Sequence, residues 1–194
     1  IGDVYIGAGE TDGMRLLAKA AGNLKKLYPG IHYHISSGNS AFVQEYLDKG
    51  LIDFGLVFVK PDSKKYESLK LPVKDVWGVI MRKEDSLAEK EAISPEDLWD
   101  KPLILSQQET NSGEIRQWIK SSFSELNVTA TYNLLFNASL LVEEGLGYAI
   151  GFDKLLNTSG DSKLCFRPLV PKLEAEMYLI WKKYQVFSKA AEKF

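Results

Sequence analysis

Two hydrophobic periods alternate along this chain of 194 residues. Short apolar runs with the period of a strand are separated by segments in which apolar residues recur every three or four positions, as in a helix. Up to residue 58 the pattern predicts strand 4–8, a helix from Met14, strand 31–35, a helix capped by Asn39 and strand 54–58. Two successive βαβ units of this kind predict a parallel sheet with right-handed crossovers.

The first helix carries apolar residues on two faces. The stripe expected to face the core consists of Met14, Leu17, Ala18, Ala21 and Leu24. The helix is expected to end at Tyr28-Pro29-Gly30, because proline disfavours a helical residue before it and glycine suits a helix exit. On the flank, Leu16, Ala20 and Leu27 form a second apolar face, which is a candidate subunit contact.

The alternation continues after a polar connection at 60–65. Ser94 is followed by proline and, three residues on, by Asp97, which predicts a helix start with a capping box. Asn111 is expected to cap a helix whose apolar stripe includes Phe123, and Asn137 is expected to open a helix over 139–144. The remaining strands are expected at 76–81, 102–105, 129–135, 148–151, 164–169 and 177–181.

This order predicts an α/β protein with two Rossmann-like lobes. Lobe I is expected to contain residues 1–74 and 152–194, and lobe II residues 75–151, because the last strands have no helices of their own and are expected to complete the first sheet. The chain would then cross between the lobes twice, near residues 73–74 and 151–152, and the two crossing strands would form a hinge.

Polar loops follow the strands at the edge where α/β sheets bind ligands, outside the carboxyl ends of parallel strands. These loops contain Glu10–Asp12, Ser37–Ser40, Ser106–Thr110 and Asn137. Small polar residues that open a helix directly after a strand expose free backbone N–H groups at the positive end of the helix dipole, a site suited to a carboxylate or another anion. The same residues would serve as helix caps without any ligand, so each is individually ambiguous.

Composition narrows the function further. Twenty-four basic and 26 acidic residues give a net charge of −2. A nucleic-acid-binding domain normally has a basic face, and no segment of this sequence concentrates basic residues, so we do not expect this chain to bind DNA directly. A single cysteine excludes an internal disulfide framework and fits a reducing compartment. No apolar run approaches the roughly 18 residues of a membrane helix, and no signal peptide is present. The chain begins almost inside a strand and ends inside a helix pattern, so we expect it to be part of a longer protein.

Three features with possible chemistry have simpler structural interpretations. His32 and His34 share one strand face but lack further metal ligands, so a solvated edge strand explains them better than a metal site. Cys165 lies in an apolar strand, which is typical of an inert core thiol. Ser106 has no histidine nearby in sequence and no nucleophile elbow, so we expect no catalytic residue, metal or cofactor.

Several segments, in this order and spacing, resemble the effector-binding domain of LysR-type transcriptional regulators over essentially the whole chain. The matching segments are Tyr28-Pro29-Gly30-Ile31, Ser37-Gly38-Asn39-Ser40, the run 47–56 (LDKGLIDFGL), Glu84-Asp85-Ser86-Leu87-Ala88, the run 98–104 (LWDKPLI) and the run 142–150 (VEEGLGYAI).

The resemblance implies a two-lobed fold of the type 2 periplasmic-binding-protein kind, with a small effector bound in the cleft. The effector-binding positions that it implies are Glu10, Thr11, Ser37, Gly38, Asn39 and Ser40 in lobe I, and Ser106, Gln107, Gln108 and Asn137 in lobe II, with Phe152 at the hinge. Two of these effector-binding positions depart from the family pattern. Phe152 replaces a frequent proline and would either line or fill the cleft. Glu10 would repel acidic effectors or pair with an effector amine.

The leading hypothesis is therefore the ligand-sensing and dimerisation domain of a cytoplasmic bacterial LysR-type regulator. We expect an anionic or amino-acid-like effector and a homodimer or tetramer. The resemblance implies side-by-side dimers, and DNA binding only through an N-terminal winged helix-turn-helix outside this chain. An extracytoplasmic solute receptor of a transporter, with the same fold, is the alternative. An enzyme built on this fold is a third reading that no catalytic constellation supports.

Overall fold

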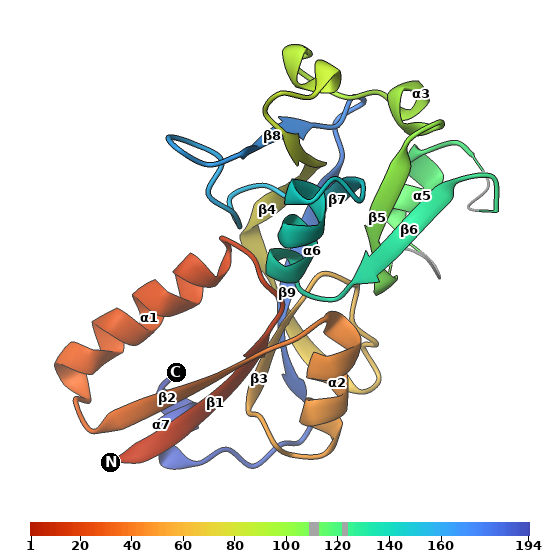
Figure 1. Ribbon diagram of the computed structural model, residues 1–194. Helices are drawn as coiled ribbons and strands as arrows, with labels where there is room; N and C mark the ends of the chain where they lie inside the picture. Colours follow the sequence, from red (N-terminus) through yellow and green to blue (C-terminus); the bar gives the residue numbers. More distant parts are fainter. Residues whose placement is uncertain (109–112, 122–123) are drawn as a thin grey trace. The chain divides into compact units, whose positions relative to one another are not determined.

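Strand–helix alternation organises the computed structural model, which describes residues 1–108, 113–121 and 124–194. Asn111 and Phe123, expected to cap and line one helix, lie outside the described residues. The chain divides into unit 1, Ile1–Lys74 with Glu176–Phe194, and unit 2, Asp75–Ala175. It passes between them within two long strands, β4 (Tyr66–Arg82) and β9 (Glu174–Lys182), which are labelled in Figure 1.

Unit 1 confirms the two predicted βαβ units. Its sheet has the order β2-β1-β3-β9, with β1 parallel to both β2 and β3, and β9 antiparallel to β3. Besides β9 and the first part of β4, its elements are β1 (Gly2–Ala8), α1 (Met14–Leu27), β2 (Ile31–Ser37), α2 (Ser40–Asp48), β3 (Phe54–Val57) and α7 (Lys189–Lys193).

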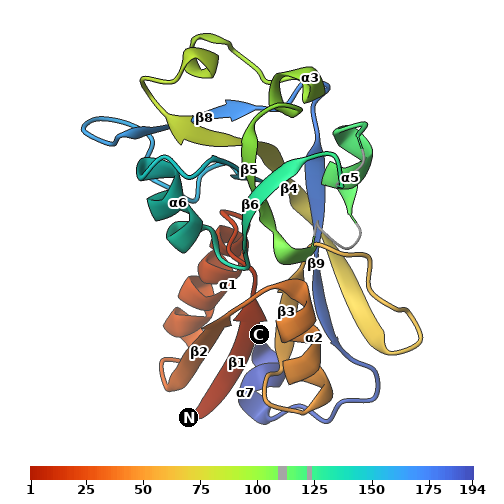
Figure 2. The same cartoon turned by 45° about the vertical axis from the view of Figure 1, so that its right-hand side comes forward.

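Helices cover both faces of the unit 1 sheet (Figures 1 and 2). Side chains alternate along β1, so that Val4 and Ile6 pack in one core with Leu17 of α1 and with α7. On the other face α2 packs its Val43 and Leu47 in a second core. Full burial of an aliphatic side chain stabilises a fold by about 1.5–3 kcal/mol, so these two layers hold the helices in place.

Unit 2 repeats this architecture with a mixed sheet. In it β5 is parallel to β6 and β7, whereas β4 is antiparallel to β7 and β8. One face packs against η1, α3 and α5, and the other against α6. Its elements are the 3-10 helix η1 (Ser86–Glu89), α3 (Pro95–Leu98), β5 (Pro102–Ser106), α5 (Glu114–Trp118), β6 (Asn127–Tyr132), α6 (Leu135–Glu143), β7 (Tyr148–Phe152) and β8 (Leu164–Pro168).

The expected second boundary between the lobes is wrong. Instead of leaving near residues 151–152, the chain stays in unit 2 until Ala175. The reason is strand pairing. β8 lies antiparallel beside β4, with Met81 opposite Cys165, and of the last two strands it is β9 that pairs with β3 of unit 1. A short strand without its own helix fits either sheet, so the sequence pattern did not distinguish the two.

Two local expectations also need correction. Ala18 is exposed, because only Leu17 of α1 is fully buried and Ala18 lies one position around the helix from it. Asn137 does not open its helix: α6 begins at Leu135, with Leu134 as the capping residue, so Asn137 is already the third helical position. The apolar residues after Asn133 enter the helix early, so the cap lies at Leu134, three positions before Asn137.

The predicted capping box at Ser94 is confirmed. The backbone N–H and the hydroxyl of Ser94 both donate to Asp97 Oδ2 at 3.0 Å, and Lys90 Nζ donates to Asp97 Oδ1 at 2.6 Å. Burial raises the pKa of the Asp97 carboxyl, but the hydrogen bonds from Lys90 and Ser94 outweigh burial and leave the pKa below its ordinary value of 3.8. The ionised carboxylate is therefore the form that stabilises this helix start.

Asp97→Asn is expected to lower the free energy of unfolding by about 1 kcal/mol near neutral pH, since it weakens a cap and removes an ion pair. A depressed carboxyl pKa contributes stability above the unfolded pKa, and this contribution disappears as the pH falls through the folded pKa. Urea denaturation of both proteins should therefore converge in acid below pH 3.8. The exposed neighbour in Glu96→Gln serves as control, and a pH-independent difference for Asp97→Asn would contradict the assignment.

Candidate functional site

Parallel pairing brings the predicted residues of unit 1 together. Ala8 lies opposite Ser37 on β2 and opposite Leu56 on β3, so the three strands end side by side. Across this edge Gly38 N–H donates to Ala8 O at 3.0 Å, and Gly9 N–H donates to Leu56 O at 3.3 Å. The loop with Glu10 and Thr11 and the loop 37–40 therefore leave the sheet next to each other. Figure 2 shows the β1 and β2 arrows in this unit.

The N-terminus of α2 lies at this edge, as predicted. Asn39 caps it by accepting a hydrogen bond from Phe42 N–H at 2.9 Å, and Val43 N–H donates to Asn39 O. The N–H groups of Ser40 and Ala41, the first two helical residues, have no acceptor within the helix. Both lie at the positive end of the helix dipole, so this turn suits a negatively charged group.

The polar side chains around this turn hold the loops in shape. Thr11 is 7% exposed, and its Oγ1 accepts from Gly13 N–H at 2.9 Å. Ser40 is 2% exposed, and its Oγ accepts from Phe58 N–H at 3.3 Å at the end of β3. A side chain at Gly38 would collide with the Phe42 ring. The loop side chains thus fix the backbone, and the backbone amides remain as donors.

The other two unit 1 positions are more open. Glu10 is half-buried and Ser37 is exposed. Nearby, Arg15 Nη2 donates to Asp12 Oδ1 at 2.9 Å on the surface. This hydrogen bond raises the pKa of the Arg15 guanidinium. Asp12 is thus paired with Arg15, whereas Glu10 is the carboxylate among the predicted effector-binding positions. Glu10 gives this edge a hydrogen-bond acceptor beside the amide donors.

Unit 2 has a corresponding edge. Ser106 ends β5 opposite Tyr132, the last residue of β6, and Gln107 and Gln108 follow it directly. Phe152 ends β7, which runs parallel to β5. Asn137 is exposed in the first turn of α6, the helix that follows β6. The unit 2 positions therefore all lie on the carboxyl ends of its parallel strands or just beyond them.

Two aromatic residues at this second edge were missed. Because β4 runs antiparallel to β7, Trp77 lies opposite Phe152, and their ring centroids are 4.4 Å apart. The Trp77 indole N–H is buried and has no hydrogen-bond partner among the described residues. Tyr132 donates its hydroxyl to Ile150 O at 2.6 Å. Trp77 lies at this edge because β4 is antiparallel to β7. The sequence pattern alone could not place it there, since it does not reveal which strands pair.

The features with possible chemistry agree with their structural interpretations. His34 is exposed on the edge strand β2. Its Nε2 lies 2.8 Å from Asp3 Oδ1, and its ring stacks on that of Tyr5 of the neighbouring strand β1. Cys165 is buried, and burial raises the pKa of its thiol. Within residues 1–108, 113–121 and 124–194, no group of three His, Cys, Asp or Glu side chains is placed to bind a metal.

The family model for the LysR substrate binding domain matches residues 1–194. The chain belongs to this family. Two curated relatives from Bacillus subtilis (strain 168) are uncharacterized HTH-type transcriptional regulators: YvbU is 27% identical over 77% of this chain, and YwbI 23% over 98%. The LysR domain described here spans 50% and 64% of the lengths of these relatives.

Solved structures share the fold of this LysR domain. The effector binding domain of QuiR in complex with shikimate is 19% identical, with a TM-score of 0.79 over 99% of this chain and 92% of that chain. HinK, a LysR family regulator from Pseudomonas aeruginosa, is 18% identical, with a TM-score of 0.77 over 98% of this chain and 67% of that chain. The CcmR regulatory domain from Synechocystis PCC6803, in complex with 2-PG, is 16% identical, with a TM-score of 0.76 over 100% and 94%.

These likenesses confirm the predicted α/β, periplasmic-binding-protein-like fold of the LysR domain. The match is to a regulator's binding domain, which is not an enzyme class, and it speaks against the alternative of a transporter receptor. Among the described residues, no helix is long and apolar enough to cross a membrane.

Asn39→Ala is expected to lower the free energy of unfolding by about 1 kcal/mol, because it removes the α2 cap. The matched Asn137→Ala should be neutral, or stabilising by up to about 0.5 kcal/mol, because alanine is the better residue inside a helix. Urea denaturation measures both. Equal losses for the two variants would contradict the different positions assigned to the two asparagines.

Proposed function

We propose that this LysR domain senses a small anionic effector through the first turn of α2 and the adjoining β1–α1 loop. The observation that carries the proposal is the pair of N–H groups at Ser40 and Ala41, held at the carboxyl edge of the sheet by the Asn39 cap. Anions bind such turns because the free amides and the helix dipole act together. The family match supports this use of the edge.

The unit 2 edge completes the effector site in this proposal, through Ser106, Gln107, Gln108, Asn137 and Phe152. The QuiR complex contains shikimate, an organic acid, which supports an anionic class for this chain as well. Glu10 disfavours a second carboxylate in the effector, so we expect a single anionic group next to a hydroxyl or amine.

In the whole protein, which we propose to be a cytoplasmic transcriptional regulator, effector binding would act on an attached DNA-binding domain. The two curated relatives, both HTH-type regulators, support this assignment. A ligand shifts a conformational equilibrium only by its difference in affinity for the two states. An effector that binds one of the two states more tightly would supply such a difference.

Asn39→Asp separates binding from folding. Aspartate is as good a cap as asparagine, so stability should stay within about 0.5 kcal/mol of wild type, but its charge should repel an anionic effector. A thermal-shift panel of shikimate, other organic acids and amino acids identifies a binder, and calorimetry then compares its affinity among variants. We expect at least a tenfold loss for Asn39→Asp.

Gln44→Glu adds the same charge beyond the first turn of α2 and is the matched control, expected to change affinity less than threefold because the dipole effect is confined to the helix end. Unchanged binding of an anion to Asn39→Asp would contradict the proposed site. Equal losses in both variants would indicate a general charge effect instead.

We further propose that the chain forms a homodimer, which can assemble into a tetramer in the full protein. The flank of α1 formed by Leu16, Ala20 and Leu27 supports this proposal: Leu27 is 72% exposed, and the other two are half-buried. Ala20→Glu places a charge on this flank. The control Ala18→Glu places the same charge at an exposed position on the other side of the buried stripe of α1. Sedimentation velocity should show a shift toward monomer for Ala20→Glu alone. Identical profiles would contradict the α1 contact.

A further inference from the structure

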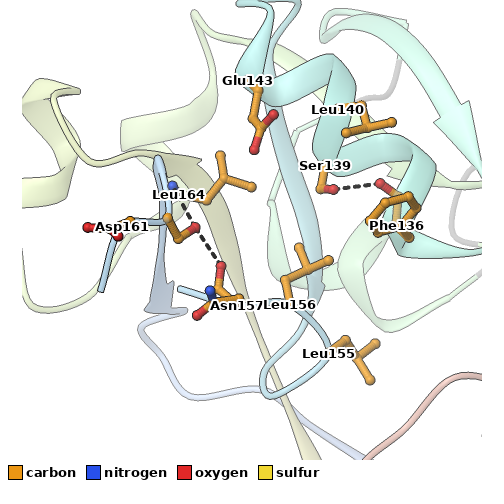
Figure 3. A pocket seen from close by; sticks show the side chains of 10 residues that line it. Phe136, Ser139, Leu140, Glu143, Leu155, Leu156, Asn157, Asp161 and Leu164 are labelled. Atoms are coloured by element: carbon orange, nitrogen blue, oxygen red, sulfur yellow. Dashed lines mark hydrogen bonds between the residues drawn. The ribbon is translucent and has the colours of Figure 1, made fainter. Parts of the chain in front are cut away.

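Unit 2 contains a pocket of about 450 Å³ that includes none of the effector positions proposed above. Small-molecule sites typically have volumes of about 300–1,000 Å³, so the size suits a ligand. One wall is a single face of α6, formed by Phe136, Ser139, Leu140 and Glu143. The spacing of these four residues places them on one side of the helix. The opposite wall comes from the segment between β7 and β8 (Figure 3).

Most of the pocket is apolar. Phe136 and Leu140 are 60% and 45% exposed, which is unusual for neighbouring large apolar side chains on one helix. Leu155 and Leu156 face them from the loop, and Leu164 lies between the two walls in Figure 3. A ligand with a hydrocarbon or aromatic group would remove this apolar surface from water.

The lining contains two carboxylates, Glu143 and Asp161, together with Ser139, Ser162 and Asn157. Ser162 donates its hydroxyl to Asn157 O at 2.6 Å, so the Asn157 amide group is the neutral donor of the lining. Ser139 is 4% exposed and donates its hydroxyl to Phe136 O at 2.5 Å, which leaves the lone pairs of its oxygen as acceptors. The Glu143 carboxylate extends toward Leu164 in Figure 3. Neither Glu143 nor Asp161, the second carboxylate of the lining, pairs with a cation in the described part of the chain.

No Lys or Arg among the described residues lines the pocket. Lys83 reaches the same loop, but its Nζ donates to Gly160 O at 3.0 Å and does not belong to the lining. The pocket therefore combines apolar walls with two negative charges and a buried acceptor. The two carboxylates disfavour an anion, and the combination fits a cation attached to an apolar body.

We propose that this pocket binds a small primary amine carrying an aromatic or aliphatic group. The ammonium donates to Glu143 and to the Ser139 oxygen, which lie one helical turn apart, and the apolar group packs between Leu140 and the leucines of the loop. An ammonium has three donors, so it satisfies both acceptors at once. The site is separate from the anionic effector edge and gives the domain a second class of ligand.

Three compounds of matched shape test the charge preference: 2-phenylethylamine, 2-phenylethanol and 3-phenylpropionate. Calorimetry or protein-observed NMR on the 194-residue chain, at about 0.15 M salt to screen surface attraction, measures their affinities. We expect saturable binding of the amine, at least tenfold weaker binding of the alcohol, and no saturation by the carboxylate. Equal binding of all three compounds, or of none, would overturn the proposal.

Two variants and a matched control locate the site. Glu143→Gln should weaken amine binding about tenfold and leave alcohol binding unchanged. Glu144→Gln removes the same charge from an exposed neighbour outside the lining and should change amine affinity less than twofold. Leu140→Trp fills the pocket and should weaken both compounds. Equal effects of Glu143→Gln and Glu144→Gln would overturn the proposal.

A second copy of the chain is the competing occupant of this surface. If it covers the pocket, Leu140→Trp changes the sedimentation profile, and 2-phenylethylamine does not bind to the wild-type protein. That outcome also overturns the amine site. Saturable amine binding that Leu140→Trp weakens, with an unchanged sedimentation profile, supports the small-molecule site.

Discussion

The parallel pairing of β1 with its two neighbours is the constraint on which the candidate effector site depends. Pairing in one register ends three strands at the same level, so the loops that follow them must leave the sheet together. The hydrogen bond from Gly38 N–H to Ala8 O joins two of these loops directly. Buried backbone N–H and C=O groups need hydrogen-bond partners, and these loops find theirs in each other and in the ends of the strands. The loop geometry is therefore fixed before any ligand binds.

This rigidity determines what the polar side chains do. Thr11 and Ser40 are buried and accept hydrogen bonds from the backbone of neighbouring segments, and Asn39 is committed to its cap. The groups left for an effector are then mainly backbone amides, whose position does not depend on a flexible side chain. Preorganised donors of this kind bind an anion with little ordering cost. Moving a two-state equilibrium from 1:99 to 99:1 requires about a 10⁴-fold difference in affinity between the two states, so tight binding alone does not make an effector act.

Much of this organisation was predictable from sequence, because it rests on local signals. The period of apolar residues located the strands and helices of unit 1, and Asn39 and Ser94 marked helix starts that the structure confirms. What the sequence did not predict depends on pairing between distant segments. The place of β8 in unit 2 follows from its register with β4, and Trp77 reaches the ligand edge only because β4 is antiparallel to β7. Asn137 failed as a cap for a different reason: a polar residue that can cap a helix is also tolerated inside one, and Leu135 and Phe136 already favour the helix.

The proposed amine pocket and the proposed anion site would separate two kinds of chemistry within one domain. Amide donors dominate the edge of unit 1, whereas carboxylates and leucines line the cavity beside α6. The two surfaces share no residue, and the pair of carboxylates in the cavity disfavours the anions that the amide donors of unit 1 attract.

The central claim is that the first-turn amides of α2 bind the effector. Backbone NMR measures this most directly, by titrating the ¹⁵N-labelled chain with the organic acid that raises its melting temperature most. We predict saturable shifts of the Ser40 and Ala41 amide resonances, larger than those of amides in the middle of α2. Saturable binding that leaves both of these amide resonances unchanged would contradict the central claim.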